Sequence, residues 1–374
     1  MIWEETWWHM SSPQRMIESA ANQILENGTV LLQLPEDLSW RHGLRAAMEE
    51  KIREWNGEGL IFEELDIQDD CPDLSSEQDA GYAVIHALKP GGSSGYRPGC
   101  GSIAQYICSE QLGLFNERVL WIKGFHNEAA CKAFCALCKH VPKGKAKIIL
   151  EDTTGCCKPG SNLRAVNYKD YVSPFDVQLL CMVAANTVRY DLSQRWREYM
   201  AVLAANLAGM DVELAFALIC ECDLQTEPPI PLLIGLSSSE AFARRGSSPD
   251  HVFYHLKNDV DGGQGYVNRR VWRSQMQVGL PILEFTQHLI RNELRDDLQR
   301  ILEEEYITQY KDQRITDLND VEAGTMVYMM GKGYLSVPSP SLRARIHCVH
   351  QNRNRIAHHE ICTNEQIDDI LQLI

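Results

Sequence analysis

Thr29-Val-Leu-Leu-Gln-Leu34 is the run of sequence that decides the fold of the first part of the chain. It is short and apolar, and the turn signal Asn27-Gly28 precedes it, so it is typical of a buried strand. Similar runs follow at Gly59–Phe62, Arg118–Ile122 and Lys147–Leu150. Helical patterns precede and separate them, at about residues 13–25, 40–55, 79–88 and 127–140. This alternation predicts an α/β domain with a parallel sheet over residues 1–155.

The order of these elements resembles the core of P-loop ATPases of the AAA or STAND kind. That family follows its first strand with a Gly-rich loop ending in Gly-Lys-Ser/Thr, whose amides and Lys hold phosphates. Here residues 34–40 read Leu-Pro-Glu-Asp-Leu-Ser-Trp, with no Lys and with two acids that would repel a triphosphate. The third strand ends in Ile122-Lys123-Gly124, where the family has a metal-binding acid. We therefore expect a degenerate P-loop-like domain without a Walker A motif, nucleotide binding or other cofactor. Some other three-layer α/β domain is the alternative.

The rest of the chain is expected to be helical. Residues 156–265 form a mainly helical middle region, in which Ser237–Gly246 is one expected helix and three prolines near residue 230 break the pattern. Glycines in Asp259–Gly265 indicate a linker. Residues 266–374 form an all-α bundle. Its helices are expected at Trp272 to about Tyr306 with Pro281 kinking or dividing it, Asp317–Met330, Ser341–His359, and from the capping box at Thr363 onward.

Composition limits the kinds of partner. The chain has 374 residues and a net charge of −15, which makes it a poor general nucleic-acid binder. Any contact with nucleic acid must be local, and the segment Arg343–His359 has four Arg and four His without an acid. An odd count of 13 cysteines, with no secretory signal, favours free thiols in a reducing cytoplasm. No apolar run reaches the roughly 18 residues of a membrane span.

The segment Arg353-Asn-Arg-Ile-Ala-His-His-Glu360 suggests a specific chemistry. An Arg followed by a polar residue and then by a His four to six positions later resembles the motif of the HEPN superfamily, closest to abortive-infection proteins of bacteria. The resemblance covers about residues 268–374. It implies a helical bundle in which two protomers pair and build one ribonuclease site. It also implies an antiviral defence or toxin effector that a protein partner or its assembly state holds inactive.

By that resemblance, Arg353 holds the scissile phosphate and His358 is the general acid or base, while Asn354 orients the imidazole. No metal is implied, and attack by the ribose 2′-OH would leave a 2′,3′-cyclic phosphate. Further contacts to the RNA substrate are expected from Arg343, Arg345, Arg355 and His359.

The same residues permit a structural interpretation. An Arg and a His five positions apart on a straight helix point roughly 140° apart. Arg353 would then pair with a buried acid such as Glu322, while His358 and His359 would complement the helix dipole. The chain would be a non-catalytic adaptor that dimerises through its C-terminal bundle.

A second candidate site is Cys131-x3-Cys135-x2-Cys138. Its spacing matches that of radical-SAM iron–sulfur enzymes, and with His140, Cys156 and Cys157 the cluster could bind zinc instead. Because the three cysteines share one face of a predicted helix, buried free thiols are the ordinary interpretation. Gly91-Gly-Ser-Ser-Gly95 lacks the context of a phosphate loop and is expected to be a linker.

Overall fold

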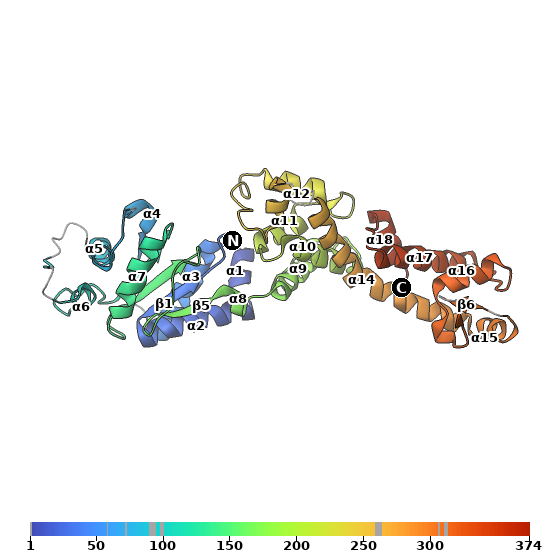
Figure 1. The fold of residues 1–374 in the computed structure, drawn as a ribbon, viewed down its shortest axis with the longest axis horizontal. Coiled ribbons are helices and arrows are strands. Elements are labelled where there is room, and N and C mark those ends of the chain that lie inside the picture. Colours follow the sequence, from blue (N-terminus) through green and yellow to red (C-terminus); the bar gives the residue numbers. More distant parts are fainter. Residues whose placement is uncertain are drawn as a thin grey trace. The chain divides into compact units, whose positions relative to one another are not determined.

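The computed structural model describes residues 2–57, 59–71, 73–89, 95–97, 101–258, 264–305, 307–309 and 313–374. The chain divides into two compact units, Met1–Asp176 and Val177–Ile374 (Figure 1). These two units differ from the three predicted segments 1–155, 156–265 and 266–374. Most of the predicted linkers at 91–95 and 259–265 lie outside the described residues.

Unit 1 (Met1–Asp176) contains a five-stranded, fully parallel sheet in the order β2-β3-β4-β1-β5. The strands are β1 Thr29–Gln33, β2 Ile61–Asp66, β3 Arg118–Lys123, β4 Ile148–Asp152 and β5 Arg164–Asn167. The expected α/β domain with a parallel sheet is therefore confirmed. Its predicted end at residue 155 is too early, because β5 pairs with β1. This edge strand has only four residues, two of them exposed, and so carries no apolar run to identify it.

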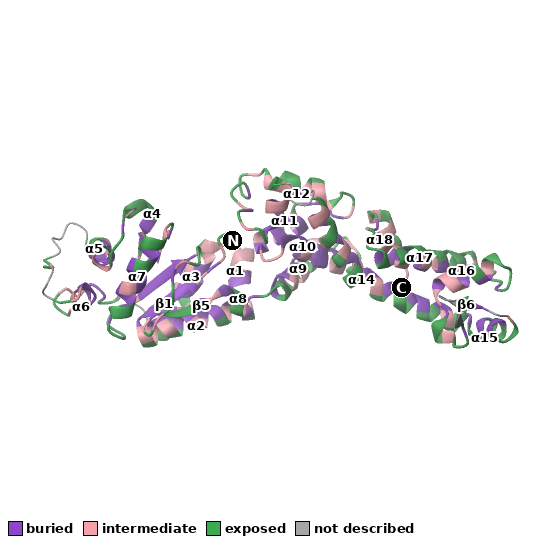
Figure 2. Cartoon of the chain, viewed as in Figure 1, coloured by how far each residue is buried: buried purple, intermediate pink, exposed green. Residues whose placement is uncertain are grey.

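Helices cover both faces of the sheet. They are α1 Ile2–Trp8, α2 Ser11–Asn27, α3 Arg41–Asn56, α4 Ile67–Asp70, α5 Glu77–Leu88, α6 Ile103–Ile107, α7 Glu128–His140 and α8 Tyr168–Tyr171. Leu31, Leu120 and Leu150 join the core beneath α5, α6 and α7. Their strand neighbours, such as Val30 and Ile149, are equally buried on the opposite face, where α2 packs on β1 and on α3 (Figure 2). A parallel sheet buried on both faces explains why its strands are continuous apolar runs.

The turn between α2 and β1 depends on Gly28. Its φ of +87° lies in the left-handed region, and its carbonyl accepts a 2.8 Å hydrogen bond from the N–H of Ile148. A Cβ at this position would lie 2.2 Å from the backbone oxygen of Ala146. Pairing of β1 with β4 fixes the backbone near both Gly28 and Ala146, so neither segment can move away to relieve this clash.

We expect Gly28→Ala to lower the free energy of unfolding by roughly 3 kcal/mol, which combines left-handed strain with a backbone clash. Gly144→Ala is the matched control, because Gly144 has a φ of +72° but nothing within 4 Å of its added Cβ. That variant should lose only about 1 kcal/mol. Urea unfolding of the two variants checks this, and equal losses would contradict the role given to Ala146.

Among its described residues, unit 2 (Val177–Ile374) has helices and one pair of antiparallel strands, β6 Thr308–Gln309 and β7 Gln313–Arg314. Its helices are α9 Pro174–Val188, which begins in unit 1, α10 Gln194–Ala208, α11 Val212–Cys220, α12 Pro229–Ser237, α13 Val252–Asn258, α14 Gln264–Glu293, α15 Arg295–Glu304, η3 Leu318–Asp320, α16 Ala323–Gly331, α17 Pro340–Ala357 and α18 Asn364–Leu371.

Three expectations about prolines and helix positions are wrong. The prolines near residue 230 do not break a helix, because α12 starts at Pro229, where the first turn needs no N–H donor. Residues 238–246, predicted as most of a helix, form turns instead. Pro281 does not divide the long helix, since α14 runs through it to Glu293. The capping box at Thr363 is confirmed.

Helix α14 explains why no domain boundary falls at residue 265. Its first half contacts α10, where Asn206 Nδ2 donates a 2.9 Å hydrogen bond to Ser274 Oγ. It also packs on α17 and α18, and its Gln287 accepts a 3.0 Å hydrogen bond from the N–H of Ala323 at the start of α16 (Figure 1). One helix thus packs against helices of both predicted segments, which form a single unit.

Within the described part of the chain, every cysteine is a free thiol. No helix among these residues combines the length and the apolar character that crossing a membrane requires.

Candidate functional site

Helix α17 carries the motif Arg353–Glu360, and the ends of the helix are well defined. Ser339 caps its N-terminus, with Oγ accepting a hydrogen bond from the N–H of Leu342. An apolar stripe of the helix is buried against α14 and α16, and it consists of Leu342, Ile346, Val349 and Ile356.

Arg353 lies at the edge of this stripe and is paired with two carboxylates. Its Nε donates a 2.7 Å hydrogen bond to Glu284 of α14, and its Nη2 donates a 3.1 Å bond to Glu322 at the start of α16. The side chain of Arg353 is 27% exposed, and those of Glu284 and Glu322 are 45% and 43% exposed. The hydrogen bond to Glu284 raises the pKa of Arg353, so the guanidinium stays charged. Glu322 was the expected partner, although its carboxylate is half-exposed rather than buried.

The two histidines close the helix. His359 has a φ of +61°, a left-handed conformation in which His is more frequent than most residues. The N–H of Glu360 donates to the carbonyl of Arg355 at 2.9 Å, and the N–H of His359 donates to the carbonyl of Ile356 at 3.2 Å. These two bonds form a Schellman motif, which satisfies the last carbonyls of α17.

Trp272 of α14 fixes this helix end. Its ring packs edge-on against His359 at 4.5 Å between centroids, and its Nε1 donates a 2.8 Å hydrogen bond to the carbonyl of Ile356. His359, predicted to contact substrate, therefore shapes the end of the helix. His358 is the C-cap residue and its side chain is exposed.

The remaining predicted residues have other surroundings than the motif suggests. Asn354 was expected to orient His358, but its amide Nδ2 donates a 3.4 Å hydrogen bond to His350 Nδ1, one turn earlier. Arg345 pairs with Glu293 of α14 at 3.5 Å, and Arg355 pairs with Glu360 at 3.8 Å. Arg343 is exposed.

The segment that has no acid in sequence is thus surrounded by acids in space. Three of its four arginines face a carboxylate, and the helix α14 supplies two of these carboxylates, Glu284 and Glu293. Their contribution was invisible in the sequence because they lie 52 or more positions away along the chain.

The slot after β1, where a P-loop would bind phosphate, is occupied by the protein itself. Glu4 Oε1 of α1 accepts a 2.7 Å hydrogen bond from the N–H of Gly43 in the first turn of α3. A helix N-terminus binds anions, and here the anion is a carboxylate of the same chain. A Cβ on Gly43 would lie 2.6 Å from Trp8, so this glycine permits α1 to pack there. Arg41, at the start of α3, pairs with Glu151 of β4 at 3.4 Å.

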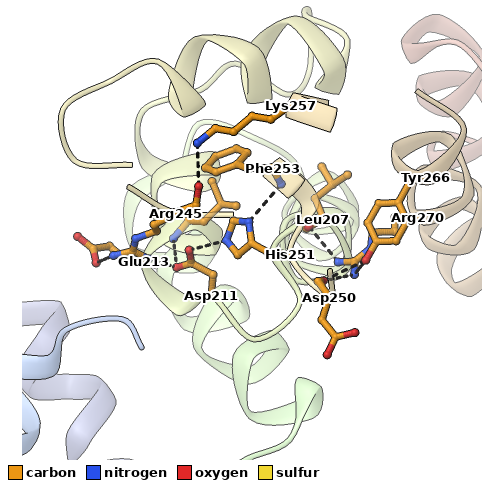
Figure 3. Close-up of polar contacts among 11 residues, drawn as sticks. Leu207, Asp211, Glu213, Arg245, Asp250, His251, Phe253, Lys257, Tyr266 and Arg270 are labelled. Carbon is orange, nitrogen blue, oxygen red and sulfur yellow. Dashed lines mark hydrogen bonds and ion pairs between the residues drawn. The ribbon is translucent and has the colours of Figure 1, made fainter. Parts of the chain in front are cut away.

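Unit 2 also holds a buried polar network that the sequence did not predict (Figure 3). Asp211 Oδ2 accepts a 3.0 Å hydrogen bond from His251 Nε2, and Arg245 forms ion pairs with Asp211 and Glu213. Burial by itself would raise the pKa of Asp211, but the hydrogen bond from His251 and the charge of Arg245 outweigh it and hold that pKa below its usual value.

Asp211 and His251 match two members of a catalytic triad in residue type only. The N–H of Phe253 donates a 3.1 Å hydrogen bond to His251 Nδ1, so both ring nitrogens are engaged within the protein. His251 is only 7% exposed. Asp211 also caps α11 by accepting from the N–H of Leu214 at 2.9 Å. The network therefore fastens residues 245–253 to the start of α11, and we assign it a structural role. No sequence motif marks it, because its members are spread over 40 positions.

No family model and no curated protein matches the chain. Among solved structures, it is similar to Cdc6p from Pyrobaculum aerophilum, with a TM-score of 0.32 and 10% sequence identity over 97% of this chain and 93% of that chain. A similarity this low carries no argument about function.

We expect Asp211→Asn to lower the free energy of unfolding by about 3 kcal/mol, because Arg245 then loses a buried partner. Glu213→Gln is the control; Glu213 is 30% exposed, so its loss should cost about 0.5 kcal/mol.

The stabilising contribution of ionised Asp211 should depend on pH. Because the pKa of Asp211 in the folded protein is below the unfolded value near 3.9, this contribution is fully present above that value and disappears as the pH falls through the folded pKa. Urea unfolding between pH 7 and about 3 should show the Asp211→Asn deficit constant at first and shrinking below about pH 4. A deficit independent of pH would contradict the ionic role.

Proposed function

We propose that the C-terminal part of unit 2 is a HEPN-like module and that the chain is a metal-independent endoribonuclease of the defence or toxin type. The observation that carries this proposal is the position of Arg353 and His358 at the solvent-accessible end of one helix. Packing of α14, α16, α17 and α18 around that helix end supports the expected bundle.

The ion pairs of Arg353 are compatible with a phosphate-binding role. Half-exposed ion pairs are worth about 0.2–1 kcal/mol each, so an incoming phosphate has little to displace. A guanidinium holds phosphate through two parallel hydrogen bonds, which are charge-assisted and stronger than neutral ones. Arg353 would then stabilise the extra negative charge of the transition state.

His358 would exchange protons with the ribose 2′-OH and the leaving oxygen, since its ordinary pKa lies near neutrality. The 2′-OH attacks the phosphorus, the bond to the 5′ oxygen breaks, and the product is a 2′,3′-cyclic phosphate. Pairing of two copies through the bundle would bring a second Arg353 and His358 to the same cleft. Arg343, Arg345 and Arg355 would contact the RNA backbone.

Regulation would follow from the acids around Arg353. Glu284 and Glu322 hold the guanidinium within one copy until RNA or a second copy competes for it. We further propose that unit 1 is an ATPase-like platform that docks a protein partner of a cytoplasmic defence complex and does not use nucleotide.

A second candidate is a non-catalytic adaptor that dimerises through the same bundle. The observation that favours it is the link that Arg353 makes between α14, α16 and α17. In that case the guanidinium fixes the bundle, and His358 and His359 only end the helix.

The test is cleavage of total RNA and of a tRNA pool in EDTA by full-length wild type, Arg353→Ala and His358→Ala. We expect both substitutions to slow cleavage about 10²-fold or more, with cyclic phosphate ends from wild type only. Arg300→Ala and His347→Ala are the matched controls, because both residues are exposed and lie outside the motif. Their rates should equal that of wild type.

The variant Glu284→Gln/Glu322→Gln separates the two candidates. If Arg353 is catalytic, removing its competitors should leave cleavage equal or faster and tighten RNA binding. If Arg353 is a structural link, the melting temperature should fall while RNA is neither cleaved nor bound. Wild-type inactivity as a purified dimer and as a toxin in cells would overturn the ribonuclease proposal and leave the adaptor.

Nucleotide use is tested separately. We expect Mg-ATP to leave the melting temperature of the protein unchanged, because Glu4 occupies the N–H of Gly43 and no Lys stands in the loop. Thermal unfolding over a concentration series of Mg-ATP checks this. A rise of several degrees in wild type would contradict the loss of nucleotide binding.

A further inference from the structure

Three ligand-type side chains meet at the carboxyl end of β4, beneath α7. Cys131 Sγ, Cys157 Sγ and a carboxylate oxygen of Asp152 all lie within 4.8 Å of one another. Cys135 is also buried, one turn further along α7, and lies outside this group of three. The four residues are buried, with exposed fractions between 0% and 4%. They come from α7, from the last residue of β4 and from the loop that leads to β5.

Asp152 is the unexpected member of this group. Its Oδ1 accepts hydrogen bonds from the N–H of Thr154 at 2.9 Å, from the hydroxyl of Thr154 at 2.7 Å and from the N–H of Gly155 at 3.1 Å. Its Oδ2 accepts a 2.9 Å bond from the N–H of Cys157, which leaves one lone pair of that oxygen for another partner. In the described chain none of these recorded partners is a basic side chain, so a buried carboxylate faces thiols without a counter-charge.

We propose that Cys131, Cys157 and Asp152 bind a zinc ion and that Cys135, which lies outside the 4.8 Å group, turns its side chain in as the fourth ligand. Tetrahedral zinc with Zn–S bonds of about 2.3 Å holds its ligand atoms roughly 3.8 Å apart, which matches a group already within 4.8 Å. Cys131 and Cys135 stand four positions apart on α7, a spacing that places both on one face of a helix. Thiolates together with one carboxylate favour a soft or borderline cation such as Zn²⁺ over Mg²⁺ or Ca²⁺.

The ion would supply the missing positive charge and join three parts of unit 1. Cys131 and Cys135 are on α7, Asp152 is the last residue of β4, and Cys157 lies in the loop between β4 and β5. With four protein ligands such a site is structural, because no position is left for water or substrate. The spacing in the sequence indicated Cys131, Cys135 and Cys138, but of these only Cys131 belongs to the group of three ligand atoms.

The experiment measures metal bound to the full-length chain purified without oxygen from zinc-supplemented cells. We expect one zinc ion per chain by elemental analysis in wild type and at least a tenfold loss in Cys157→Ser and in Asp152→Asn. Cys138→Ser is the matched control, since Cys138 is an equally buried cysteine of the same helix. It should retain the full zinc content.

A second measurement does not depend on the folding of any variant. Wild type loaded with Co²⁺ should show thiolate-to-cobalt charge-transfer absorption, and the chelated protein should expose more alkylatable thiols than the zinc-loaded protein. Wild type that binds no zinc and shows no cobalt–thiolate absorption would overturn the proposal.

Discussion

Unit 2 depends on the burial of one face of α14 along its whole length. In proteins most of the stability of a helix comes from packing of its apolar face, so the buried positions of α14 need partners in both halves. Those positions follow the 3–4 spacing of an amphipathic helix, and four of them are polar: Ser274, Gln275, Thr286 and Gln287. Gln275 both donates to and accepts from the backbone of Cys362 at 2.9 Å. Apolar contacts supply most of the adhesion, whereas such paired amides fix how α17 and α18 align with α14.

That alignment decides the electrostatics of the motif. Seen in sequence, the helix Arg343–His359 is a basic segment without acids. Packed on α14 and α16, it receives Glu284, Glu293 and Glu322 as neighbours. The cationic footprint is therefore local and partly neutralised. Under the proposed ribonuclease function, the phosphates of RNA would compete with these carboxylates for Arg353.

In unit 1, acidic side chains also accept hydrogen bonds from backbone N–H groups that could otherwise bind a ligand. The N-terminus of α3 offers N–H groups to an anion, and Glu4 takes that position. At the neighbouring strand, Asp152 accepts four hydrogen bonds from the loop that follows it. Carboxylates thus organise the carboxyl end of the sheet, the edge at which parallel α/β folds usually bind ligands.

The sequence by itself determined the parallel sheet and the helices in the regions of α14 and α17, because buried strands and helix faces impose a local period on apolar residues. Local chemistry also identified the capping box at Thr363. The edge strand β5 escaped prediction, since a short half-exposed strand has no such period. Only the tertiary structure decided which polar and charged side chains lie next to one another. Glu284 with Arg353, His251 with Asp211, and Asp152 with Cys131 are joined across 69, 40 and 21 positions, and pairing over such separations follows from packing and not from any local pattern.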